Sequence, residues 1–241
     1  MRNGLFWSGV LFFLMTVGGC TSQVVEQSDI LLEPKKTKSK MLSAAQTSAN
    51  LGLRYLMSGD LVKAKASLLQ AMRDDPQSAS VWYSMGYYQE ATGDVAQAET
   101  DYRRAIALAP HSGEAINDYG TFLCRQGRYQ EAITQFSKAV LSNNYLYVAE
   151  AYENAGLCAL LIPDKPLAKN FFLKAIDHNP ALKNSVLELA QLYFEEGNSY
   201  KAKFYLARFD LLTNPTPESR RLAQRLALSS KGFLFEGRRA P

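Results

Sequence analysis

The sequence repeats itself every 34 residues. Small residues recur at this spacing, most clearly at Gly52, Gly86 and Gly120 and, further along each unit, at Ala64 and Ala98. A period of this length indicates a repeat architecture in which each unit is one pair of antiparallel helices that cannot bury its apolar face alone. The period therefore predicts an all-α protein built as a stack of helical hairpins.

The spacing and the residue types resemble the tetratricopeptide repeat, and they predict a solenoid of about five to six such repeats over residues 43–230. The first copy spans 45–78, the second begins at Ala79 and the third near Gly113. The fourth is displaced by two extra residues, the fifth is degenerate, and a last helix from about Glu218 to Ser230 resembles a first helix without its partner. Residues 231–241 are predicted to form a C-terminal tail.

The recurring residues have physical reasons to be where they are. A glycine or alanine at the eighth position of each repeat lets the two helices of a hairpin approach closely. A second set of glycines is expected to end the first helices in a left-handed conformation, and prolines are expected to stop the second helices. The glycines are Gly59, Gly93, Gly127 and Gly197, and the prolines are Pro76, Pro110 and Pro180.

The first twenty residues resemble a bacterial lipoprotein signal peptide. A short basic start is followed by an apolar run from Leu5 to Val17, and two glycines then precede Cys20. The resemblance implies cleavage after residue 19, lipidation of Cys20 and a polar tether over residues 20–42. Because Thr21 is not the aspartate associated with inner-membrane retention, it also implies the inner leaflet of the outer membrane, facing the periplasm. An ordinary signal peptide or a single membrane anchor is the alternative.

Two cysteines remain for the repeats. Cys124 and Cys158 lie at similar heights on the predicted first helices of the third and fourth repeats, which are expected to be neighbours. In an oxidising compartment this placement predicts a disulfide between them. The alternative is a pair of buried free thiols.

The sequence offers no pattern that indicates catalysis. It lacks a nucleotide-binding loop, a zinc-binding helix motif and a nucleophile elbow, so we expect no enzyme and no cofactor. His111 and His178 both fall in predicted turns between repeats, so no metal site is expected. A formal net charge of +4, dispersed along the chain, does not indicate nucleic-acid binding, and no small-molecule substrate is implied.

The predicted function is binding of a protein partner. A solenoid of this type lines its concave face with first helices, and positions pointing away from the repeat core are apolar in the first two repeats. Leu53, Met57, Tyr83 and Tyr87 are the predicted contacts, whereas the same face becomes polar further along the chain. An amphipathic helix or strand is therefore the expected ligand.

The whole chain resembles the type IV pilus biogenesis and stability lipoproteins (PilW/PilF), the pilotins of the pilus secretin. The resemblance rests on the lipobox, the tether, the repeats and the stretches 117–124 and 154–158. It implies a non-enzymatic protein that promotes localisation and oligomerisation of the secretin. The alternative is another outer-membrane repeat lipoprotein, which serves as a scaffold for peptidoglycan enzymes or for β-barrel assembly.

Overall fold

The structure is a computed structural model that describes residues 43–236, with side chains described for residues 43–229. The predicted signal peptide, Cys20 and the predicted tether lie outside the described residues. The described part is all-α and contains no strand. Its helices are α1 (Ala44–Met57), α2 (Leu61–Asp74), α3 (Ala79–Ala91), α4 (Val95–Leu108), α5 (Gly113–Arg125), α6 (Tyr129–Ala139), α7 (Val148–Ala159), α8 (Lys165–His178), α9 (Lys183–Glu195), α10 (Ser199–Leu212) and α11 (Pro217–Glu236).

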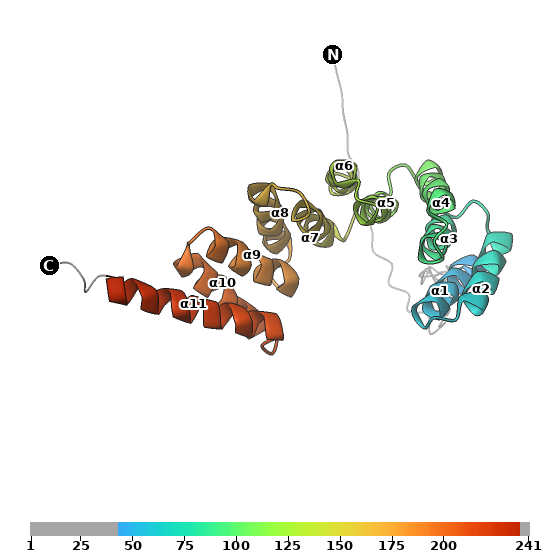
Figure 1. The fold of residues 1–241 in the computed structure, drawn as a ribbon. Helices are drawn as coiled ribbons and strands as arrows, with labels where there is room; N and C mark the ends of the chain where they lie inside the picture. The colour runs from blue at the N-terminus through green and yellow to red at the C-terminus, as the bar shows by residue number, and fades with distance from the viewer. Residues whose placement is uncertain (1–42, 237–241) are drawn as a thin grey trace, which may run out of the picture. The chain divides into compact units, whose positions relative to one another are not determined.

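The first ten helices pack in consecutive pairs, α1 with α2 through α9 with α10, and each pair contacts the next (Figure 1). The prediction of five tetratricopeptide hairpins and one further helix is confirmed. The last helix differs from its predicted bounds, because α11 continues to Glu236. Residues 231–236 contain no proline to interrupt the helix, so the predicted C-terminal tail was too long.

Helix ends follow the turn residues of the sequence. Gly59, Gly93, Gly127 and Gly197 have φ between +77° and +89°, the left-handed region that glycine adopts without strain. Asp60 then accepts a hydrogen bond from the backbone N–H of Lys63 and caps α2. The fourth repeat lacks the glycine, and Asp164 caps α8 in the same way before Pro166. Each hairpin turn is therefore encoded locally.

Glycine at the eighth repeat position is required by the opposite helix. A Cβ atom added to Gly156 would lie 2.6 Å from a ring carbon of Phe172, closer than real Cβ contacts allow. Gly52 and Gly120 face Leu68 and Phe136 in the same way, at 2.6 and 2.9 Å, whereas a Cβ atom on Gly86 would lie 3.2 Å from a ring carbon of Tyr102, a tight contact. The glycine thus makes room for a large side chain sixteen residues later, as the repeat pattern predicted.

The buried apolar side chains form three groups in the described part of the chain. One group joins α1, α2 and α3, and a larger one extends from α4 to α11. The division falls in the second hairpin, whose helices also bury the polar side chains of Ser84 and Asp101. The third group contains Tyr145, which packs against Gly113. Tyr145 lies in the connection between α6 and α7, where the repeat is two residues longer than the usual 34. Buried polar side chains do not by themselves divide the core, because Ser185 and Ser219 are equally buried and lie on helices of the larger group.

The predicted disulfide between Cys124 and Cys158 is present in the structure, with the two Cα atoms 5.9 Å apart. It joins α5 to α7 and therefore ties the third hairpin to the fourth. We expect the Cys124→Ser/Cys158→Ser double variant to lose about 3–4 kcal/mol of unfolding free energy, because the bond closes a 34-residue loop in the unfolded chain. Urea unfolding of both proteins measures the loss. Equal stability, or full alkylation of both cysteines in the unreduced wild type, would contradict the bond.

Candidate functional site

The first helices of the hairpins lie side by side. Each of α1, α3, α5 and α7 contacts the first helix of the next hairpin, whereas consecutive second helices of the described chain do not contact one another. The side chains that α1, α3, α5, α7 and α9 leave exposed therefore belong to one surface, which we call the first-helix surface. This is the surface on which the sequence placed the partner contacts.

The four predicted contacts differ in accessibility. Met57 is 82% exposed and Tyr87 is 40% exposed, so both are available to a partner. Leu53 is half-buried. Tyr83 is also half-buried and packs against the larger core group, and this burial, followed by the charge of Asp118, raises the pKa of its hydroxyl. Tyr83 is therefore the least accessible of the four residues.

A polar network holds Tyr87 in place on the first-helix surface. Arg125 of α5 donates two hydrogen bonds of 2.6 Å to the carboxylate of Glu90 on α3, and Tyr102 donates a third to the same carboxylate. The guanidinium of Arg125 also lies 5.8 Å from the centre of the Tyr87 ring. A bidentate pair of this kind fixes geometry, and the cation stacks on the aromatic face. The network therefore fixes the position of the Arg125 guanidinium beside the exposed Tyr87 ring.

Asp118 lies on α5, largely withdrawn from solvent. Burial, the largest cause, raises the pKa of its carboxyl to about 6, and the charge of Glu114 acts in the same direction. A hydrogen bond from Asn117 and the charge of Arg125 oppose the rise. Because the folded-state pKa lies above the ordinary aspartate value of 3.8, the folded chain binds a proton more tightly than the unfolded chain does. The carboxyl therefore favours folding at low pH, and this contribution is lost as the pH rises through about 6.

We expect Asp118→Asn to raise the free energy of unfolding at pH 8 by roughly 1–3 kcal/mol, because the amide needs no buried charge. The difference between variant and wild type should shrink as the pH falls to 4, where the aspartate is protonated in the folded state. Urea unfolding at pH 4, 6 and 8 measures both effects. A variant that is less stable at pH 8, or a difference that does not change with pH, would show that the carboxylate is stabilised by its neighbours.

Two apolar residues of the same surface were missed. Leu157 and Leu161 occupy, in the fourth repeat, the positions of Leu53 and Met57 in the first, and they are 39% and 59% exposed. The sequence interpretation described this part of the face as polar from its glutamates. Aligning Gly156 with Gly52, which allows for the two extra residues, places both leucines at predicted contact positions and could have identified them from the sequence.

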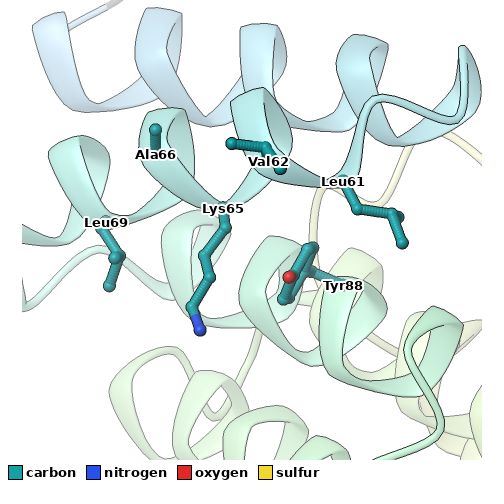
Figure 2. A pocket seen from close by; sticks show the side chains of 6 residues that line it. All are labelled: Leu61, Val62, Lys65, Ala66, Leu69 and Tyr88. Atoms are coloured by element: carbon teal, nitrogen blue, oxygen red, sulfur yellow. The ribbon is translucent and has the colours of Figure 1, made fainter.

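A shallow apolar depression of about 340 Å³ lies on the second helix of the first hairpin. Figure 2 shows five of its lining side chains on α2, with Tyr88 of α3 beside them. Val62, Ala66 and Leu69 share one exposed helix face by their spacing, and Lys65 is the single cation of the lining. The sequence interpretation missed this depression because it considered only first helices as binding elements. Apolar residues at helical spacing on the outward side of α2 were the available signal.

The described residues offer binding surfaces and no arrangement that indicates a cofactor site. Among them, no group of three or more histidine, cysteine, aspartate or glutamate side chains is placed to hold a metal ion. Of the two histidines, His111 is exposed and His178 stacks on Tyr152 with ring centres 5.5 Å apart. None of the helices in residues 43–236 is both long enough and apolar enough to cross a membrane.

Comparison with known proteins supplies the family context. Residues 35–191 match the tetratricopeptide repeat family. The type IV pilus assembly protein PilF of Pseudomonas aeruginosa is 30% identical over 201 residues, which are 83% of this chain and 77% of that protein. The solved structure of P. aeruginosa PilF superposes with a TM-score of 0.69 at 30% identity, covering 78% of this chain and 85% of that one.

A second solved structure has the same fold. PilW, described as a widely conserved type IV pilus biogenesis factor, superposes with a TM-score of 0.68 over 78% of this chain and 86% of its own. At 23% identity this similarity supports the fold alone.

Proposed function

Because the chain belongs to the tetratricopeptide repeat family and is homologous to the type IV pilus assembly protein PilF, we propose that it is a pilotin. In this proposal it is a non-catalytic outer-membrane lipoprotein that binds subunits of the pilus secretin. Binding delivers the subunits to the outer membrane and promotes their oligomerisation into the channel through which the pilus leaves the cell.

The single observation that carries the proposal is the similarity to PilF, which extends through 83% of this chain at 30% identity. The first-helix surface supports it. Met57 and Tyr87 are large, largely apolar side chains that are exposed to water, and such exposed groups often mark a binding site. Aromatic residues also supply much of the binding energy at protein interfaces. Together with Leu53 and Tyr83 they form the proposed binding site of the secretin.

The proposed anchor is Cys20, which lies outside the described residues. The lipobox-like sequence before it supports cleavage to a mature chain that begins with this cysteine and carries acyl chains. Several acyl chains give stable membrane attachment, whereas one alone is marginal. The tether of residues 20–42 would then let the repeats reach a partner in the periplasm.

Co-purification from membranes tests the proposal. The full chain, solubilised in detergent after brief cross-linking in cells, should retain the secretin, and cells that lack the gene should accumulate secretin that is not in the outer membrane. Recovery of peptidoglycan enzymes or β-barrel assembly factors in place of the secretin, with normal secretin location in the deletion strain, would reject the pilotin role.

A further inference from the structure

The first-helix surface carries a second exposed apolar pair, formed by Leu157 on α7 and Leu161 just after its end. Leu157 is 39% exposed and Leu161 is 59% exposed, so the described helices leave much of each side chain accessible to a partner. Met57 and Tyr87 belong to the first and second hairpins, whereas this pair belongs to the fourth. A peptide chain that lies across the first helices would therefore meet the two groups at different hairpins. The pair is therefore separate from the proposed contacts of the first two hairpins.

Glu153 is the carboxylate next to this second pair on α7. It lies one helical turn before Leu157 and accepts hydrogen bonds from the side chain of Asn184 and from the backbone and hydroxyl of Ser185 on α9. Glu188 follows one turn beyond Asn184 on α9, near enough to Glu153 for the charge of that residue to raise its pKa. The two helices thus bring two acidic side chains together, one of them a single turn away from Leu157.

Glu153 and Glu188 form no ion pair among the described residues. The hydrogen bonds to Glu153 come from neutral groups at the N-terminal end of α9, and burial followed by the charges of Glu195, Glu218 and Glu153 raises the pKa of Glu188. Glu195 is paired with Lys165 at 2.7 Å. The contrast is with α3 and α5, where Arg125 pairs with Glu90. A cation of a bound segment would therefore supply an opposite charge that the ion pairs of the described residues do not supply to Glu153 and Glu188.

We infer that the α7–α9 part of the first-helix surface is a second docking site, which binds a polypeptide segment that carries leucine-like side chains next to lysine or arginine. The apolar side chains of the segment cover Leu157 and Leu161, and its cations approach Glu153 and Glu188. Apolar contact supplies the affinity, and charge complementarity selects against acidic segments. The inference deepens the proposed function, on which it rests only for the identity of the partner.

Selection from a phage-displayed library of random peptides tests the site without assuming the partner. The full chain, purified from membranes in detergent, is the target, and enriched peptides should combine leucine, isoleucine or phenylalanine with lysine or arginine within a few residues. Leu157→Glu/Leu161→Glu should weaken these peptides at least tenfold, and Glu188→Gln should reduce the salt dependence of their binding. The matched control is Leu211→Glu, an exposed leucine of α10, which should bind them unchanged.

Several results would overturn the inference. They are the absence of enrichment, the enrichment of acidic peptides, and equal binding to the Leu157→Glu/Leu161→Glu variant. If that double variant fails to fold by circular dichroism, Leu161→Glu alone replaces it, since this leucine lies beyond the helix end and is the more exposed of the two.

The purified periplasmic part of the secretin separates this inference from the pilotin proposal. Secretin that binds the wild type and the Leu157→Glu/Leu161→Glu variant equally would remove the second site and leave the pilotin role intact. Secretin that binds neither protein, while the selected peptides bind only the wild type, would leave the site and reject the secretin as its partner.

Discussion

Leu53→Glu/Tyr87→Glu is expected to abolish binding of the secretin. Both residues lie on the first-helix surface, and Tyr87 is exposed yet held in place by Arg125. A partner that covers them would have to bury two carboxylates, of which only the one at position 87 has a cation, Arg125, near it. Loss of an aromatic anchor alone costs about 2 kcal/mol or more at such sites. We therefore expect a loss of affinity of roughly 100-fold or more, measured by fluorescence anisotropy with labelled secretin.

The matched control for this prediction is Val62→Glu, which places the same charge on the exposed face of α2. It should bind the secretin like the wild type. Helical circular dichroism and the melting temperature of both variants should stay close to those of the wild type. A folded double variant that still binds would move the site elsewhere on the chain, whereas a variant that unfolds would show that Leu53 or Tyr87 contributes to the core.

Cys20→Ala is expected to remove the chain from the outer membrane completely. In the proposal the cysteine thiol is the acceptor of the lipid, and none of the helices in residues 43–236 is long and apolar enough to cross a membrane in place of acyl chains. The variant should therefore appear as soluble or inner-membrane-retained precursor, and the secretin should be mislocalised with it. Membrane fractionation with detection of both proteins measures the effect.

Cys20→Ser serves as a second variant for the anchor, because it keeps the size of the residue and removes only the thiol. It should behave like Cys20→Ala. Recovery of either variant in the outer membrane with bound acyl chains would contradict the lipidation site. Normal secretin location beside a soluble variant would instead show that delivery does not depend on the anchor.

Much of the fold could be predicted because each hairpin is specified by local rules. Gly93 must adopt a positive φ, and Gly156 must leave room for Phe172, so the residues that repeat are those that the backbone requires. The division of the core could not be predicted in this way. It falls in the second hairpin, where Val81 and Met85 of α3 pack into one group and Tyr102 of α4 packs into the other, and the period does not specify which neighbours a helix packs against.

The candidate site was predicted less completely. The periodicity placed Met57 and Tyr87 on an accessible surface, but it could not show that Tyr83 packs inward against the larger core group. The position of Arg125 beside Tyr87 was not predicted either, because its pairing with Glu90 joins residues that are 35 positions apart and lie on different hairpins. Contacts of this kind depend on the register between neighbouring hairpins, which a sequence pattern within one repeat does not specify.

Reconstitution of secretin assembly tests the central claim most directly. Secretin is synthesised in the presence of liposomes that carry the purified lipidated chain, and heat-resistant multimers are counted on a gel against liposomes without it. We expect rapid multimer formation with the wild type, little without it, and little with Leu53→Glu/Tyr87→Glu. Equal yields of multimer with and without the chain would contradict the pilotin role.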